Sequence, residues 1–251
     1  MLTPDDDILE LAQKYYRESA TFVVLNDMPE ALPKGSAAPC AGALLSIDLE
    51  APPETMLIVK DRAAYFRISH VCLSLFRDIV ISLGARGEWM QLSGNGIVAY
   101  FIDHGFSNNV WNALLAARQA RSMLAEILPE VAPLFKTLKL SVKSAIHYDL
   151  FLEAHTGLWG QSAAWPVGAP LHVIAAMQTI NTGGAIFVSE SAQEKLDVES
   201  IFGHALSLKR EKYKKILFAP VSPLKTGGKK YPVYVFNDKN FEKLLTLSAR
   251  G

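Results

Sequence analysis

The sequence predicts an α/β domain of the α+β kind, with a ferredoxin-like β-α-β-β-α-β core that follows an N-terminal helix. Two long segments, 60–83 and 108–128, carry apolar residues at helical spacing and predict the two helices of that core. Short apolar runs before, between and after them predict strands, and Gly94-Asn95-Gly96 marks a hairpin, because Asn-Gly accepts the positive φ of a tight turn. This order is typical of an antiparallel or mixed sheet with helices on one face.

Composition restricts the class of protein. The chain has 251 residues, of which 50% are hydrophobic, and its 25 basic and 25 acidic residues cancel. A neutral chain lacks the positive field of a general nucleic-acid or acidic-membrane binder. Two cysteines, Cys40 and Cys72, make neither a disulfide framework nor a metal-ligand spacing. We therefore expect a globular cytoplasmic protein without a signal peptide and without a nucleic-acid partner.

The N-terminal part predicts a helix followed by an extended arm. Thr3 can cap the helix, Pro4 suits its first position, and Asp5–Asp7 complement its dipole. An apolar stripe at helical spacing follows, and residues 28–42 are rich in proline and glycine, which indicates an arm or linker. We expect two parts: residues 1–40, the helix and Pro-rich arm, and residues 41–251, the main domain.

The remaining elements follow the fold in chain order. In the core we expect strands and helices at Ala43–Leu49 (strand), Lys60–Leu83 (helix, ended by Gly84), Glu88–Ser93 and Ile97–Ile102 (hairpin), Asn108–Leu128 (helix, closed by Pro129), Leu138–His147 (strand) and Leu150–His155 (return strand). After it we expect Leu171–Ile180 (helix), Ala185–Ser189 (strand), Glu190–Leu196 (helix), and the strands Ile216–Ala219 and Tyr231–Phe236. The charge-free run 154–189 is broken repeatedly by glycine and proline, so no membrane span is expected.

Three possible motifs favour ordinary structural interpretations. Gly94–Ala99 matches a loose dinucleotide fingerprint, but a strand follows it where the fingerprint needs a helix. No two of the six histidines have the helical spacing of metal ligands. The basic run 209–215 indicates a solvated face more strongly than a phosphate or nucleic-acid patch, because the total charge is neutral.

Several segments in order resemble the catalytic domain of class III nucleotidyl cyclases, the adenylate and guanylate cyclase family. Gly42–Leu49 is similar to its first strand, Ser93–Phe101 to its second hairpin, and Ser144–His147 to its Gly-Ile-His strand. Gly168–Met177 with Ile186–Ser191 is similar to the late helix and strand, and Lys225–Gly228 with Pro232–Phe236 to the closing hairpin. The resemblance covers roughly residues 41 to 237 and implies a core of the class III cyclase type.

The resemblance implies a reaction and a set of partners. In the family a ribose 3′-oxygen attacks the α-phosphate of a nucleoside triphosphate, and two metal ions bridged by two aspartates stabilise the attacking and leaving groups. An asparagine and an arginine of the partner subunit meet the developing charge, and a lysine and an aspartate recognise the base. The implied partners are therefore a nucleoside triphosphate and a second copy in a homodimer, and the implied cofactor of an active member is Mg²⁺ or Mn²⁺.

Carried over by position, the family pattern is only partly present. Asp48 matches the first metal aspartate, and Lys225 a lysine that contacts the phosphates. The other positions carry different side chains, namely Asn95 at the second metal aspartate, Gln91 at the base-reading lysine, Trp165 at its aspartate, His172 at the asparagine and Ala176 at the arginine. His172 is then the candidate catalytic group, Lys225, Gln91 and Trp165 candidate substrate-binding groups, and Asp48 and Asn95 candidate metal ligands.

No small shift of register recovers the missing charges. The runs 89–102 and 154–189 contain no charged side chain, so neither the second metal carboxylate nor the arginine can be restored nearby. The loop after Asp48 reads Glu50-Ala51-Pro52-Pro53, and its two prolines lack amide hydrogens of the kind that hold a triphosphate in the family. The sequence therefore favours a degenerate cyclase-like domain, a nucleotide-binding, regulatory or dimerisation module with lost or weak cyclase activity.

Two alternatives stay open. An active divergent cyclase would hold metal through Asp48, Glu50 and Asn95, and its altered base-reading positions would permit a pyrimidine substrate, as in bacterial anti-phage signalling. A palm domain of the diguanylate-cyclase or polymerase type shares the core topology, but it needs an acidic hairpin that Gly94-Asn95-Gly96 does not provide.

Overall fold

The computed structural model describes residues 10, 13–14, 16–17, 23–27, 32–51, 62–103, 109–131, 138, 140–155, 164–181, 183–196, 210–221, 223–226 and 228–248. Contacts divide the chain into two units. The first unit contains Met1–Cys40 and Leu150–Gly168, and the second contains Ala41–Asp149 and Ala169–Gly251. The domains expected from the sequence, 1–40 and 41–251, stay a prediction.

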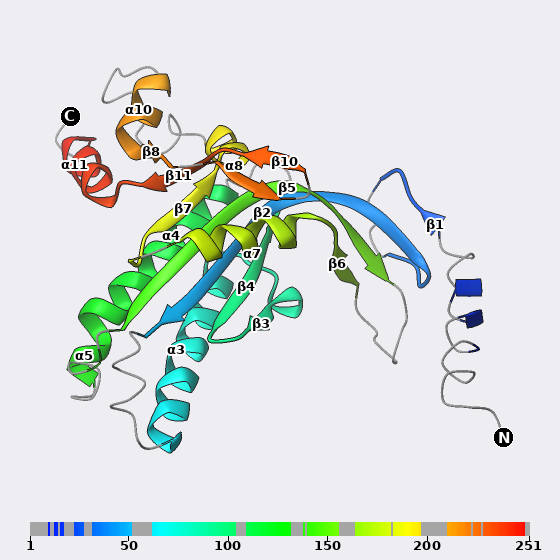
Figure 1. Cartoon of the computed structure of the whole chain (residues 1–251), viewed down its shortest axis with the longest axis horizontal. Helices are drawn as coiled ribbons and strands as arrows, with labels where there is room; N and C mark the ends of the chain where they lie inside the picture. Colours follow the sequence, from blue (N-terminus) through cyan, green and yellow to red (C-terminus); the bar gives the residue numbers. More distant parts are fainter. Residues whose placement is uncertain are drawn as a thin grey trace. The chain divides into compact units, whose positions relative to one another are not determined.

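The second unit contains the predicted β-α-β-β-α-β core (Figure 1). The elements of this core are β2 (Ser36–Glu50), α3 (Arg62–Ser82), β3 (Gln91–Ser93), β4 (Gly96–Ile102), α4 (Asn109–Ser122) and β5 (Ser141–His155). Residues 36–40 of β2 and 150–155 of β5 belong to the first unit. These strands lie in the sheet order β3-β4-β2-β5, with β4 antiparallel to both β2 and β3. That order is the ferredoxin-like arrangement, so the predicted fold class is confirmed.

Further elements extend the sheet beyond β5. They are α7 (Pro170–Ile180), β7 (Ile186–Ser189), α8 (Glu190–Lys195), α10 (Arg210–Leu217), β8 (Phe218–Pro220), β9 (Leu224–Thr226), β10 (Lys229–Tyr231), β11 (Val233–Phe236) and α11 (Asp238–Ser248). Strand β7 runs parallel to β5, and β11 and β8 continue the sheet in antiparallel pairs. Strands β9 and β10 form a separate antiparallel hairpin, as expected near residues 225–228.

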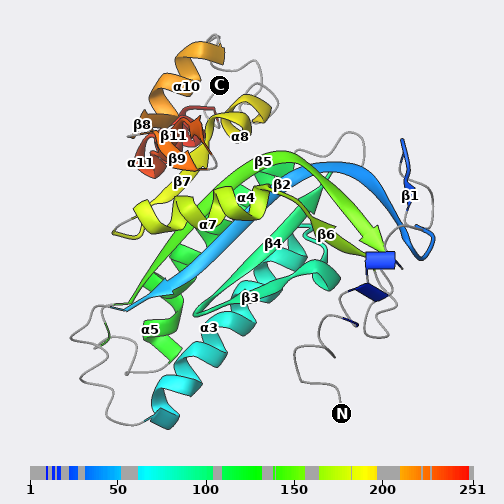
Figure 2. The ribbon, with the colours of Figure 1, turned by 45° about the vertical axis from the view of Figure 1, so that its right-hand side comes forward.

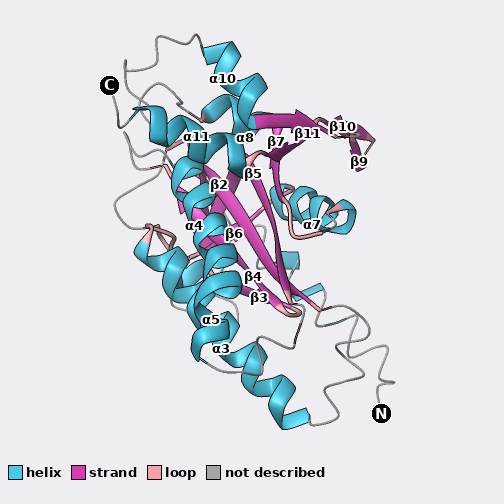
Figure 3. Ribbon diagram, turned by 90° about the vertical axis from the view of Figure 1, so that its left-hand side faces the viewer, coloured by secondary structure: helices cyan, strands magenta, loops and turns pink. Residues whose placement is uncertain are grey.

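The two faces of the sheet carry different side chains because successive residues of a strand point to opposite faces. The odd-numbered residues Leu45 and Ile47 of β2 belong to the main apolar core with α3 and α4. The even-numbered residues Ser46 and Asp48 therefore point to the opposite face. The core helices α3 and α4 share one face, as predicted, whereas α7 lies on the other face (Figure 3). A buried amide on α7, that of Gln178, donates to the main-chain oxygens of Ser46 and Lys143 and ties α7 to β2 and β5.

Several predicted boundaries were wrong. The expected strand from Glu88 begins instead with a 3-10 turn, η1 (Gly87–Trp89), which turns the chain before β3. The two strands expected at 138–147 and 150–155 are one strand, because Tyr148 and Asp149 stay extended and no glycine or proline interrupts 141–155. Its antiparallel partner is the short β6 (Trp165–Val167). The strand expected from Ile216 starts at Phe218, since Ile216 still belongs to α10.

Pro129 does not end the second long helix as predicted. After α4 the chain makes a π-helical turn, η2 (Met123–Ile127), in which the N–H of Leu128 bonds to the oxygen of Met123. The short helix α5 (Leu128–Val131) follows. A proline is tolerated in the first turn of a helix, where its missing N–H has no partner to lose. The wide turn therefore lets the helical path continue past Pro129.

The first unit contains the N-terminal segment and the outer part of β5. Described residues between 10 and 17 are helical, which agrees with the predicted helix; Thr3, Pro4 and Asp5–Asp7 lie outside the described residues. Strand β1 (Val23–Val24) pairs in parallel with the start of β2, so part of the expected arm is a strand. The oxygen of His155 accepts a hydrogen bond from the N–H of Gly35 at 2.6 Å, which joins the residue before β2 to the last residue of β5.

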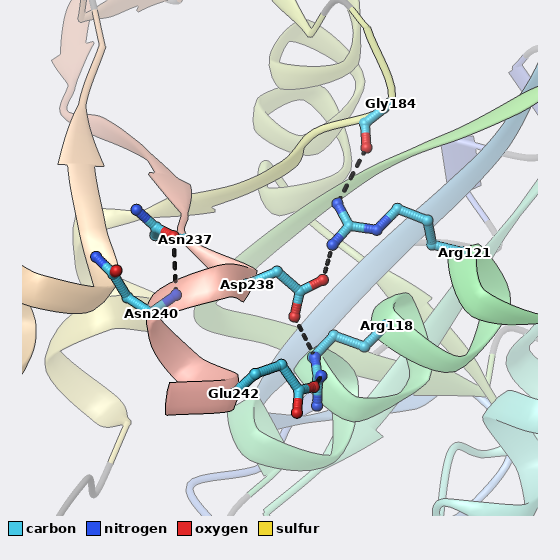
Figure 4. Close-up of polar contacts among 7 residues, drawn as sticks. All are labelled: Arg118, Arg121, Gly184, Asn237, Asp238, Asn240 and Glu242. Carbon is cyan, nitrogen blue, oxygen red and sulfur yellow. Dashed lines mark hydrogen bonds and ion pairs between the residues drawn. The ribbon is translucent and has the colours of Figure 1, made fainter. Parts of the chain in front are cut away.

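The C-terminal helix α11 is held to α4 by ion pairs (Figure 4). Arg118 and Arg121 of α4 share the carboxylate of Asp238, and Arg118 also pairs with Glu242. Arg121 also donates to the oxygen of Gly184 at 3.3 Å. Because two arginines of α4 bind one carboxylate at the start of α11, these ion pairs hold helix α11 against helix α4.

The amphipathic helix α10 contains most of the basic run. Tyr213 is buried, whereas Lys212 and Lys215 are exposed, as expected for a solvated basic face. No helix of the described residues is long and apolar enough to span a membrane.

Two phenylalanines of α3 provide a test of this packing. Phe76 is fully buried, and Phe66 is 70% exposed. We expect Phe76→Ala to lower the free energy of unfolding by about 3–5 kcal/mol, because it removes apolar contacts and leaves a cavity. The matched variant Phe66→Ala should change it by less than about 1 kcal/mol. Urea unfolding measures both values, and equal losses would contradict the assigned faces of α3.

Candidate functional site

The end of β2 meets the β3–β4 hairpin at Asp48. Asp48 pairs with Gly96 in the sheet, and a Cβ atom at Gly96 would overlap Asp48 Oδ1 and the oxygen of Ile47. The N–H of Leu49 donates to the oxygen of Asn95 at 3.1 Å. The structure therefore brings the two positions expected at the metal site, Asp48 and Asn95, to the same end of the sheet.

The hairpin is confirmed, but its centre lies one residue earlier than expected. Ser93 pairs with Gly96, so the two turn residues are Gly94 and Asn95. Gly94 has the positive φ of 60° that such a turn requires. Gly96 is instead the first residue of β4, where the close approach of Asp48 excludes a side chain.

Asp48 is partly buried, and a cationic side chain, that of Lys143, acts on its carboxyl group. Burial raises the pKa of its carboxyl group, while the Lys143 ammonium and the Ser46 hydroxyl lower it. The hydroxyl of Ser46 donates to Asp48 Oδ1 at 3.4 Å. The neighbours of Asp48 thus include a cation and a hydroxyl, and a nearby cation competes with a divalent ion for the carboxylate.

The described side chains do not make a two-metal site. No three of the described His, Cys, Asp and Glu side chains lie together as candidate metal ligands. The carboxylate of Glu50, the other acid of the alternative site, accepts a hydrogen bond from the Ser141 hydroxyl at 3.3 Å. Two divalent cations need bridging carboxylates, and Asp48 with the amide of Asn95 supplies one negative charge. Pro52 and Pro53 of the adjoining loop lie outside the described residues.

Gln91, expected at the base-reading position, contacts a neighbouring strand. Its amide nitrogen donates to the hydroxyl of Tyr100 at 3.2 Å. Tyr100 is buried, which raises the pKa of its hydroxyl, and it packs edge-on against Trp89. Arg86 lies over the Trp89 ring at 4.5 Å. Gln91 therefore completes a packed polar and aromatic cluster at this edge of the sheet.

The remaining predicted site residues lie on separate elements. His172 is exposed in the first turn of α7, and Ala176 is half-buried one turn later. Lys225 is exposed on β9, opposite Lys230 of β10, and β9 contacts α7. Trp165 belongs to the first unit, where it pairs with Ala154 on β5 and is 40% exposed. Their functional roles stay predictions.

A buried polar cluster around His147 was not predicted. His147 Nδ1 lies 3.0 Å from the Ser189 hydroxyl, and its Nε2 lies 3.5 Å from the Asp149 carboxylate. The Ser191 hydroxyl donates to the oxygen of Tyr148 at 2.6 Å. These contacts join β5, β7 and α8, and Ser189 also caps α8. The Ser-Glu-Ser sequence after the predicted strand 185–189 was the available signal, because serine favours helix N-caps.

Comparisons with known proteins agree with this architecture. The adenylyl cyclase CyaB from P. aeruginosa is similar in structure with a TM-score of 0.63 and 12% identity, over 80% of this chain and 96% of that chain. A bacterial light-regulated adenylyl cyclase matches with a TM-score of 0.60 and 11% identity, over 98% and 70% of the two chains. The guanylate cyclase domain of RhGC from Catenaria anguillulae, solved with GTP, matches with a TM-score of 0.55 and 12% identity, over 79% and 97%. No family model and no curated protein matches the sequence.

These likenesses show the fold. At 11–12% identity they show that the fold is similar to that of cyclase catalytic domains, as the resemblance of the sequence segments implied. The activity depends on the residues of the site, which differ from the family pattern at Asn95, Gln91, Trp165, His172 and Ala176.

The His147 cluster predicts a pH dependence of stability. Burial lowers the pKa of His147, opposed by Asp149, so the folded protein keeps the ring neutral at a pH where the unfolded chain binds a proton. The free energy of unfolding should therefore be constant above about pH 6.5, and fall below it by up to about 1.4 kcal/mol per pH unit.

Urea unfolding between pH 7.5 and pH 5 checks this expectation. His147→Gln should lower stability at neutral pH but flatten the loss below about pH 6.5, because the titrating group is gone. His172→Gln, at an exposed site, should leave the slope unchanged. A slope that persists in His147→Gln would assign the titration to other groups.

Proposed function

We propose that this chain is a degenerate class III cyclase-like domain that acts as a nucleotide-binding, regulatory or dimerisation module, with cyclase activity lost or weak. The observation that carries the proposal is that Asp48 is a single carboxylate with a lysine, Lys143, as a neighbour. The neighbours of this carboxylate include Lys143, Ser46 and the Gly96 backbone, and the position of the second metal carboxylate is an amide.

Charge explains why the reaction would be weak. Displacement of pyrophosphate builds negative charge, which the family meets with two metal ions and a partner arginine. Here the position of the arginine is the methyl group of Ala176, and among the described residues Asp48 has the amide of Asn95 where a second carboxylate is needed. A missing arginine of this kind removes on the order of 10³-fold or more in rate.

Binding of a triphosphate demands less than catalysis. Lys225, Lys229 and Lys230 gather on the β9–β10 hairpin, where all three are exposed. A cluster of lysines attracts phosphate as point charges without metal. Together with the resemblance, this supports a nucleoside triphosphate as ligand. The homodimer and the cytoplasmic location that we propose with it rest on the sequence and the resemblance alone.

A product assay tests the loss of activity. The protein is incubated with each of the four ribonucleoside triphosphates and Mn²⁺ or Mg²⁺, and products are identified by mass spectrometry. We expect less than one 3′,5′-cyclic nucleotide per chain during the incubation, because the metal set is incomplete. Many turnovers per chain that Asp48→Asn abolishes would overturn the proposal in favour of an active divergent cyclase, and the base of that product would show whether its substrate is a pyrimidine.

Thermal unfolding in the same samples tests binding separately. A binding triphosphate should raise the Tm by roughly 5–10 °C at a hundred times its Kd. Lys225→Gln should reduce that shift, and Lys243→Gln, an exposed lysine of α11, should not. No shift with any of the four triphosphates would overturn the nucleotide-binding role.

A further inference from the structure

A groove of about 520 Å³ lies between α3 and the β3–β4 hairpin, within the second unit. These two elements run side by side in the fold (Figure 2). Phe66 and Leu73 of α3 line one side, and Leu92 and Ile97 of the hairpin line the other. The volume is within the range of small-molecule sites in proteins, about 300–1,000 Å³.

The walls of the groove are apolar and solvent-exposed. Phe66 is 70% exposed and Leu92 is 76% exposed, although both are large hydrophobic side chains. The Phe66 ring stacks on the imidazole of His70, with ring centres 6.1 Å apart and planes at 15°. Binding of an apolar molecule here would remove the Phe66 ring and the Leu92 side chain from water, which is favourable.

The polar groups of the groove favour an anion. Arg77 lines the groove, and no Asp or Glu is among its described lining residues. Arg77 lies 3.3 Å from Asp78, but both side chains are largely exposed, and such a surface pair is weak. The other polar side chains that line the groove, those of Ser69, His70, Ser74 and Asn95, carry no negative charge, so Arg77 is the ionic group that a ligand meets there.

We propose that this groove binds a small amphiphilic anion, with a flat apolar body and one carboxylate or sulfonate group. The body packs between Phe66 and Leu92, and the acid group pairs with Arg77. The volume of about 520 Å³ and the single arginine in its lining favour a small molecule over a protein surface. This inference goes beyond the proposed function and does not depend on it.

The position of the groove links such a ligand to the Asp48 end of the sheet. Gly94 and Asn95 also line the groove, and the oxygen of Asn95 accepts the hydrogen bond from Leu49. The ligand therefore contacts the turn that adjoins Asp48.

Fluorescence titration with anilinonaphthalene sulfonate tests the proposal on the full chain. We expect one probe to bind per chain. Leu92→Glu, which places a carboxylate against the apolar body, should weaken binding by about tenfold or more. Arg77→Gln should weaken the sulfonate probe by about tenfold and leave its neutral analogue N-phenylnaphthylamine unchanged. Ile127→Glu, at a 56% exposed apolar residue outside the groove, is the matched control and should change neither.

Three outcomes would overturn the proposal. The first is a probe affinity that both groove variants leave unchanged while their unfolding midpoints match the unmodified chain. The second is an equal loss of affinity for the charged and the neutral probe in Arg77→Gln, which would show that the groove does not recognise the acid group. The third is self-association that Leu92→Glu abolishes in light scattering, which would assign the face to a second copy of the chain.

Discussion

The close approach of β2 and β4 at Asp48 and Gly96 is the constraint on which the candidate site depends. A side chain at Gly96 would overlap both the Asp48 carboxylate and the backbone of Ile47, so this position must be glycine. The turn before it then falls on Gly94 and Asn95, and the Asn95 backbone bonds to Leu49. The hairpin tip is thereby fixed at the end of β2, with an amide where the family pattern has an acid.

The fold resembles that of a cyclase domain, whereas the polar side chains at the sheet differ from those of the family pattern. The sheet order, the two core helices and the late helix α7 are those of a cyclase-like domain, and solved cyclases match it over most of the chain. The polar groups at the sheet have structural partners instead: Gln91 binds Tyr100, Gln178 binds the backbone of β2 and β5, and His147 binds Ser189. A fold can persist after the groups that carried a reaction have been replaced, since packing and catalysis depend on different side chains.

The core was predictable because its signals are local. Apolar periodicity over 60–83 and the glycine-rich hairpin at 94–96 each depend on a few neighbouring residues. The helix is present over Arg62–Ser82, and the hairpin is present with its turn one residue earlier than the expected Asn95-Gly96. The continuation of the helix past Pro129 and the single strand 141–155 were missed, because a π-turn and the absence of a turn leave no clear local signal. The site was predictable as positions along the chain, whereas the Lys143 charge acting on Asp48 arises from strands that meet only in the sheet.

The central claim is that the Asp48 end of the sheet has too little negative charge for a pair of divalent ions. Electron paramagnetic resonance of Mn²⁺, titrated with a nonhydrolysable triphosphate analogue present, counts the bound ions directly. The account predicts at most one weakly bound protein-dependent Mn²⁺ per chain, little changed in Asp48→Asn. Two tightly bound Mn²⁺ ions that are both lost in Asp48→Asn would contradict it.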